Sequence, residues 1–537
     1  MSSSSKSQTF LWVNESSLSQ PRKPGTASST IRQHVQQARK RGSRHKEIEV
    51  SAATKTIVRD GWHKLDTSVE LDNAGSPYEL AYKDADGGLG RPMPTLQRLG
   101  FGAAAWKGNS DPFGSYPITI TPRVNNVLSF IRDEWLPAEF LTKTEIFIRM
   151  TLSRIEWSDI TQCLSSEDSA YALLSMYATL LARRSPNAQA LRYSLYCKHQ
   201  GLTSLRAWLS GGKGIPRDSI SRLAGVTFLL GAAICDDNMA EAEFHVRALK
   251  QLFDNRDAIP TGSTEHNVFL RALRFDVRLA LVRLSPTIFD MESHAQHLLR
   301  RTFGFGSRFF QNFPNTLFTS PMDCYLSEPL RTLIVRTRQV FWLWQHQDLD
   351  IHNDDMVILS HWVRGDHYII QGSLINYFAK TRAKLRGSDK NTILLAVELC
   401  LSLGLLCVHN NPRMTGESTH DCTAVLLQCL QELLVYFEEV GMGLSREEFK
   451  SKNAVLWSLF IGTILSRWRR IGAPNTLNEW FSQKLAIHVS TMRLTTWQEV
   501  REQLSLLLYF DEMTPFLSNW FITCVDVRHE NDVEGTR

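Results

Sequence analysis

Residues Thr392–Val408, TILLAVELCLSLGLLCV, form the longest nearly unbroken apolar run in the chain. As an α-helix this run would span roughly 26 Å, at about 1.5 Å per residue. Glu398 is its one charged residue, so the helix would be apolar on every side and would need other helices around it. A membrane crossing is the less favoured interpretation, because it needs about 20 apolar residues and this run also includes Ser402 and Gly404. The run therefore predicts the core of a large helical body.

Helical patterns follow one another along the chain from Arg123 onward. The expected helices cover residues 123–133, 143–163, 167–184, 187–210, 217–235, 238–255, 264–284, 290–302, 325–346, 354–380, 391–409, 420–439, 446–470, 475–490 and 495–509. Turn residues such as Pro260-Thr261-Gly262 separate them, and no alternating strand pattern of useful length occurs. The sequence therefore predicts an all-α fold, a large irregular multi-helix array of about fifteen helices.

The front of the chain has a different composition. Residues 1–30 are rich in serine and are predicted to be disordered, whereas residues 31–46 show the pattern of a short basic helix. Glycine and proline interrupt residues 47–110, which we expect to form a flexible linker. The helical domain is expected to occupy residues 111–525, followed by a disordered tail at residues 526–537.

Positive charge is concentrated in the first 60 residues. They hold eleven Lys or Arg against four acidic residues, a net charge of +7, which leaves the other 477 residues at −2. Candidate contacts for nucleic acid, or a nuclear-import address, are Arg32, Arg39, Lys40, Arg41, Arg44 and Lys46. Binding through them would be weak, salt-dependent and blind to base sequence, since nothing here reads base edges. A solvated basic linker explains the same charges equally well.

No catalytic or metal-binding pattern stands out. Nine cysteines occur without a C-x-x-C pair, mostly among apolar residues, which is typical of thiols packed as small hydrophobes in a reducing compartment. The densest group of candidate ligands lies between His346 and His367. It fails the EF-hand pattern because Asn353 replaces the turn glycine and Leu359 replaces the bidentate glutamate, so we interpret it as an acidic interhelical loop. We predict no enzyme, metal or cofactor, although a Ser-His-Asp or Cys-His site assembled in space stays open.

Several segments match a family pattern in order. They are Arg192–Leu209 (RYSLYCKHQGLTSLRAWL), Ser219–Asp236, Ala242–Phe253 with His245 and Leu249, Leu456–Phe460, and Trp497–Val500 followed by Leu504 and Leu508. In this order they resemble the helical regulatory domain of fungal-specific transcription factors of the zinc binuclear cluster class. The resemblance implies an all-helical domain that works through effector response and contacts with other proteins.

The chain departs from that family at its DNA reader. The family reads DNA with an N-terminal cluster of six cysteines and two zinc ions, and here no cysteine precedes Cys163. Without those thiolates such a module cannot fold around metal. The resemblance therefore implies a nuclear regulator-like protein without its own zinc-cluster reader, which contacts transcription machinery or co-regulators and is gated by a small molecule in its core. Two alternatives remain for the function: a non-transcriptional helical scaffold and, less favoured, an enzyme. Part of the protein could also be cytoplasmic. No membrane association is expected, and the oligomeric state is open.

Overall fold

The computed structural model describes residues 116–137, 147–184, 188–210, 220–345, 353–387, 392–410, 420–441, 448–468 and 476–509. All of them belong to a compact unit that spans residues 94–537. Of the described residues 83% are helical and none forms a strand, so the prediction of an all-α array is confirmed. The predicted disordered segment 1–30, basic helix 31–46, linker 47–110 and tail 526–537 lie outside the described residues.

Sixteen α-helices make up this part of the chain. In the first half they are α4 (Pro122–Phe130), which continues as a π-helical turn (Ile131–Trp135), α6 (Phe147–Cys163), α7 (Glu167–Arg184), α8 (Ala188–Ser210), α9 (Ile220–Cys235), α10 (Met239–Phe253), α11 (Thr264–Arg283), α12 (His294–Leu298) and α13 (Arg300–Phe310). Two 3₁₀ turns follow, η5 (Asn315–Leu317) and η6 (Pro321–Tyr325). The second half holds α14 (Glu328–Gln345), α15 (Asn353–Gly387), α16 (Thr392–His409), α18 (His420–Gly441), α19 (Glu448–Trp468), α20 (Thr476–Thr491) and α21 (Trp497–Ser505).

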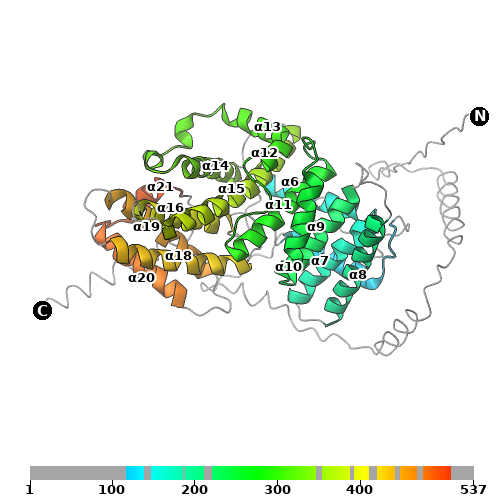
Figure 1. Ribbon diagram of the computed structural model, residues 1–537. Coiled ribbons are helices and arrows are strands. Elements are labelled where there is room, and N and C mark those ends of the chain that lie inside the picture. Colours follow the sequence, from blue (N-terminus) through cyan, green and yellow to red (C-terminus); the bar gives the residue numbers. More distant parts are fainter. Residues whose placement is uncertain are drawn as a thin grey trace, which may run out of the picture. The chain divides into compact units, whose positions relative to one another are not determined.

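Two groups of helices are joined by α11 and α15 (Figure 1). In the first group α7 packs against α8 and α9, and α9 packs against α10 and α11. In the second group α16 packs against α15, α18 and α19, and α19 packs against α20. Helix α15 has 35 residues and contacts α6, α11, α13, α14 and α16, so it runs through both groups.

Helix α16 is the core helix that its apolar run predicts. Every side chain from Ala396 to Asn410 is buried, between α15, α18 and α19. Its one acid, Glu398, accepts hydrogen bonds from the backbone nitrogen of Ser327 (2.7 Å) and from the hydroxyl of Tyr377. The buried carboxylate is thus satisfied and ties the chain just before α14 to the core. No helix in the described ranges is long and apolar enough to cross a membrane.

One predicted helix, residues 290–302, differs in the structure. Two helices occupy this region, α12 and α13, and the second continues to Phe310. Gly304 and Gly306 weaken the helical pattern there, because glycine costs about 1 kcal/mol in a helix interior. The close approach of α15 accounts for Gly306, since a Cβ at that position would lie 2.1 Å from Nε1 of Trp362. A tertiary contact therefore explains a residue that looks like a helix terminator in the sequence.

Gly404 and Gly304 give a matched pair of glycine substitutions within helices. An added Cβ on Gly404 would lie 2.4 Å from Cζ3 of Trp457, whose ring is fixed by its hydrogen bond to the carbonyl of Leu508. Gly404→Ala is expected to lower the free energy of unfolding by about 1–3 kcal/mol through overpacking. Gly304→Ala meets nothing within 4 Å and should raise the free energy of unfolding by up to about 1 kcal/mol. Urea unfolding measures both, and a stabilised Gly404→Ala protein would contradict this packing.

Candidate functional site

A buried ionic junction holds α6, α11 and α15 together. Glu156 of α6 accepts a hydrogen bond from Nη2 of Arg271 (2.8 Å) at one carboxylate oxygen and from Nη2 of Arg364 (2.8 Å) at the other. All three side chains are almost fully buried, and the guanidinium of Arg271 also lies over the ring of Phe228. Burial alone would raise the pKa of Glu156, but the charges of the two arginines outweigh burial and lower it to about 2. The carboxylate is therefore ionised across the physiological range.

Asp159, one helical turn after Glu156, completes the junction. Its Oδ1 accepts a hydrogen bond from Nδ2 of Asn267 (2.8 Å), and its Oδ2 lies 3.5 Å from Arg271. Burial raises the pKa of Asp159 to about 6, because Arg271 is already shared with Glu156 and offsets burial only in part. The two carboxylates of α6 thus differ in protonation behaviour although they bind the same arginine.

Buried histidines surround this junction and the neighbouring α14–α16 contact. The rings of His266 and His361 meet edge to face at 4.8 Å, and burial lowers their pKa values to about 3 and about 4. Nδ1 of His367 lies 3.0 Å from Nδ1 of His409, and burial lowers both of their pKa values as well. These rings are neutral at pH 7. His266 hydrogen-bonds to Thr302, and His409 to His367 and Thr337.

The interpretation of residues 346–367 as an interhelical loop is wrong for the described part of that stretch. His361, Asp366 and His367 lie inside α15 and are buried. Asp366 forms an ion pair with Arg336 of α14. The described residues contain no group of three or more His, Cys, Asp or Glu that could hold a metal ion. His361, Asp366 and His367 therefore serve helix packing, whereas Asp354 and Asp355 are exposed in the first turn of α15.

The junction contains acids and bases but no activated nucleophile. Cys163 lies on the same helix, and burial raises the pKa of its thiol to about 12. A thiol attacks as its thiolate, so Cys163 stays unreactive in this environment. The geometry of the junction supports a structural role, in which charge pairs fix how three helices cross.

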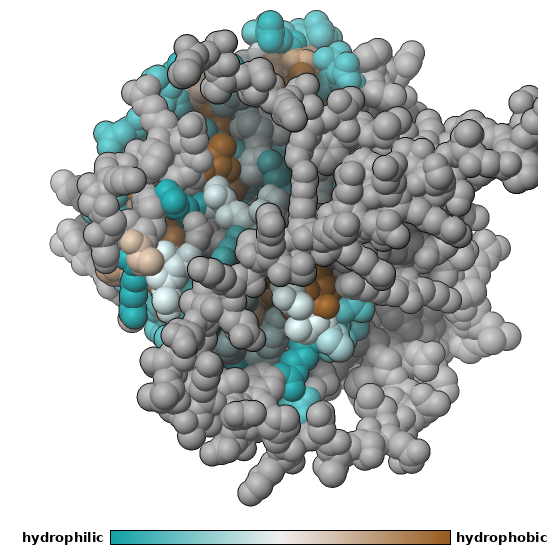
Figure 2. Space-filling model, turned by 90° about the vertical axis from the view of Figure 1, so that its right-hand side faces the viewer, coloured by the Kyte–Doolittle hydropathy of each residue, from teal (hydrophilic) through white to brown (hydrophobic). Residues whose placement is uncertain are grey.

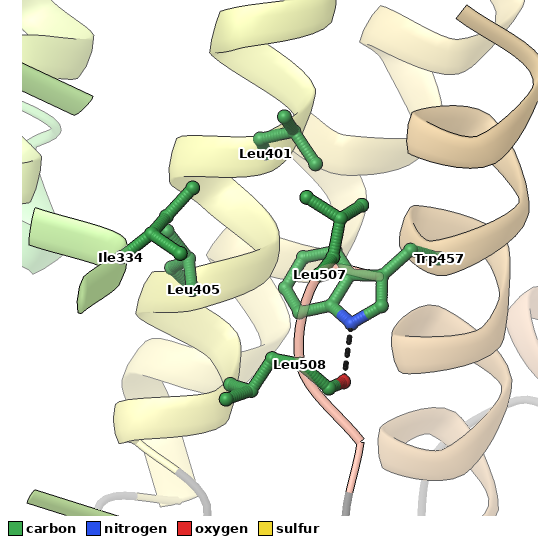
Figure 3. Close-up of a pocket in the computed structure, with 6 residues that line it drawn as sticks. All are labelled: Ile334, Leu401, Leu405, Trp457, Leu507 and Leu508. Carbon is green, nitrogen blue, oxygen red and sulfur yellow. Dashed lines mark hydrogen bonds between the residues drawn. The ribbon is translucent and has the colours of Figure 1, made fainter. Parts of the chain in front are cut away.

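An apolar crevice lies where the chain after α21 crosses α14, α16 and α19 (Figure 3). It is lined by Ile334, Leu401, Leu405, Trp457, Leu507 and Leu508. Nε1 of Trp457 donates a hydrogen bond to the carbonyl of Leu508 (2.7 Å), and Nε of Arg338 donates one to the carbonyl of Leu507 (2.8 Å). The crevice is too tight to hold a water molecule. The two hydrogen bonds hold residues Leu507 and Leu508 over the crevice.

The outer side of α8 carries exposed apolar side chains beside a positive charge. Leu191 is 45% exposed, Leu195 52% and Tyr196 42%, and Arg192 between them is exposed too. We call these four residues the α8 face. Figure 2 views the structure from the side on which α8 is the outermost labelled helix of Figure 1. The described residues visible there include both hydrophobic and hydrophilic ones.

The six basic residues predicted to contact nucleic acid or direct nuclear import lie outside the described residues. They are Arg32, Arg39, Lys40, Arg41, Arg44 and Lys46, and their role stays a prediction.

The sequence did not predict the junction or the α8 face. One signal for the junction was present in α11, where the charged Arg271 lies among the apolar residues of VFLRAL.

Comparison with protein-family models, with curated proteins and with solved structures finds no match to this chain.

Proposed function

We propose that this chain is a transcription-regulator-like protein without its own zinc-cluster DNA reader, and that it acts through contacts with other proteins. The observation that carries the proposal is the α8 face, an apolar and basic surface on the first of the helices that resemble the fungal regulatory domain. A solvent-exposed cluster of apolar side chains on a folded helix is characteristic of a surface that binds a partner.

The packing of the helices that carry the resemblance supports this proposal. Segments Arg192–Leu209, Ser219–Asp236 and Ala242–Phe253 correspond to α8, α9 and α10, which are consecutive in the chain. Helix α9 packs against α10, and both α8 and α9 pack against α7. The segments thus belong to one packed group in which α8 carries the exposed α8 face. The crevice of Figure 3 is closed, so it lends no support to gating by a small molecule in this conformation.

Localisation of the tagged full-length chain in cells tests the proposal. We expect a nuclear signal that is lost in the triple variant Arg39→Ala, Lys40→Ala, Arg41→Ala, because a nuclear-import address depends on clustered basic residues. In a second assay the full chain is fused to an unrelated DNA-binding domain, and transcription of a reporter gene is measured. We expect the fusion to change reporter output and the Leu195→Ala variant to reduce that change.

The non-transcriptional scaffold is the competing outcome. A cytoplasmic signal that is unaffected by the triple variant, together with an unchanged reporter, would reject the regulator and leave a helical protein that binds partners elsewhere in the cell.

A further inference from the structure

The α8 face exists because α8 packs against the body through a narrow stripe. Ser194, Cys197, Gly201 and Leu205 are buried. The hydroxyl of Ser194 bonds to Thr179 Oγ1 (2.5 Å) and to the carbonyl of Ser175 (3.0 Å), both on α7. At Gly201 an added Cβ would lie 3.4 Å from the backbone nitrogen of Ala172 in α7, within ordinary van der Waals contact. Small residues thus seat α8 on α7 and leave its opposite side to solvent.

The apolar part of this surface has helical spacing. Leu191 and Leu195 lie four residues apart and therefore on one side of α8, with Tyr196 beside them. An ion pair between Lys198 and Glu241 (2.8 Å) ties α8 to α10, and Phe244, one turn after Glu241, is 70% exposed. Single exposed leucines are ordinary on a protein surface, but Leu191, Leu195 and Tyr196 lie within about one and a half turns of one helix.

The charged side chains of α8 itself are all positive. Helix α8 contains Arg192, Lys198 and Arg206 and no Asp or Glu. Lys198 is paired with both Glu241 and Asp236, and Glu243 of α10 is paired with Arg247 and Arg283. Arg192 has no ion-pair partner among the described residues, and it lies one turn before Leu195 and Tyr196.

We infer that the α8 face binds an acidic amphipathic helix of a partner protein. Two turns of apolar side chains on the partner would cover Leu191, Leu195 and Tyr196, and a carboxylate at the rim would pair with Arg192. This inference deepens the proposed function and rests on its premise that the chain works through protein contacts. An anionic membrane is a weaker fit, because each surface cation adds only about 1 kcal/mol and stable anchoring takes two signals.

A binding titration with the full-length chain tests the inference. The probe is a fluorescent 20-residue peptide with leucine at helical positions i, i+3, i+4 and i+7 and glutamate on its other faces. Fluorescence anisotropy should show saturable binding that weakens with added salt. Leu195→Ala should weaken binding about tenfold, as expected for a central apolar contact. Arg192→Glu should weaken binding as well and reduce its salt dependence.

Leu394→Ala is the matched control, because Leu394 is an exposed leucine on another helix, α16. Its affinity for the peptide should equal that of the unmodified chain. A second control is the same peptide with lysine in place of glutamate, which should not bind. Equal binding of both peptides, equal affinity of the Leu195→Ala and unmodified chains, or no binding at all would overturn the inference.

Vesicles of phosphatidylcholine with phosphatidylserine test whether the α8 face binds an anionic membrane instead of a partner helix. Binding to these vesicles that is lost in Leu195→Ala, with no binding of the acidic peptide, would replace the inference by a membrane contact. If the chain binds the peptide in vitro but stays cytoplasmic in cells, the inference about the α8 face holds and the proposed role as a transcription regulator is rejected. A nuclear, transcriptionally active chain that does not bind the peptide would keep the proposed regulator and reject the α8 face as a site for an acidic helix.

Discussion

Replacing Glu156 by Gln is expected to lower the free energy of unfolding by about 3–5 kcal/mol, because the change leaves buried Arg364 without a counter-charge and leaves Arg271 with Asp159 alone. Arg271 and Arg364 each donate to one oxygen of this carboxylate at 2.8 Å, and the three side chains are almost fully buried. Glutamine has nearly the same shape, so the substitution tests charge with little change in packing. Urea unfolding followed by circular dichroism measures the loss.

Glu243→Gln is the matched control for this prediction. Glu243 also joins two arginines, Arg247 and Arg283, but it lies at the surface. Water and salt screen such a pair, so the substitution should leave stability nearly unchanged. Similar losses in the two variants would show that burial does not set the strength of the junction. Replacing Glu156 by Leu and both Arg271 and Arg364 by Met should recover part of the loss, since apolar residues of similar volume often substitute well for a buried ion network.

The helices could be predicted because their cause is local. Helical spacing and turn residues predict residues 167–184, and α7 spans Glu167–Arg184. The uniformly apolar run at Thr392 predicts α16 for the same reason. The ends of α12 and α13 could not be predicted, since a contact with Trp362 of α15 accounts for Gly306. Periodicity reports which face of a helix is buried, and it does not report which distant helix buries it.

The candidate sites are not encoded by local spacing. Glu156 is 115 residues from Arg271 and 208 residues from Arg364, so no short motif contains the junction. The α8 face is also invisible in the sequence, because Leu191 and Leu195 look like core positions of an amphipathic helix. They are exposed because the other side of α8, with Ser194, Cys197 and Leu205, is the side that is buried against the body. Tertiary packing therefore determines which apolar stripe becomes core and which becomes surface.

Acidification from pH 7 to pH 5 is expected to reduce the free energy of unfolding by roughly 4 kcal/mol, because the unfolded chain binds more protons than the folded chain in this range. Burial lowers the pKa values of His266, His361, His367 and His409, so these rings stay neutral in the folded state. In the unfolded state each takes up a proton near pH 6.5, and stability therefore falls as the pH drops below that value.

Two buried aspartates act in the opposite direction. Burial raises the pKa of Asp159 to about 6 and that of Asp276 to about 7, so the folded state gains their protons while the unfolded state stays ionised down to about pH 4. Two such groups offset part of the loss from four histidines, because each unmatched proton corresponds to about 1.4 kcal/mol per pH unit. Urea unfolding at pH 7, 6 and 5 measures the slope. His361→Gln should make the slope shallower. A stability that rises toward pH 5 would show that the aspartates dominate the buried charge balance.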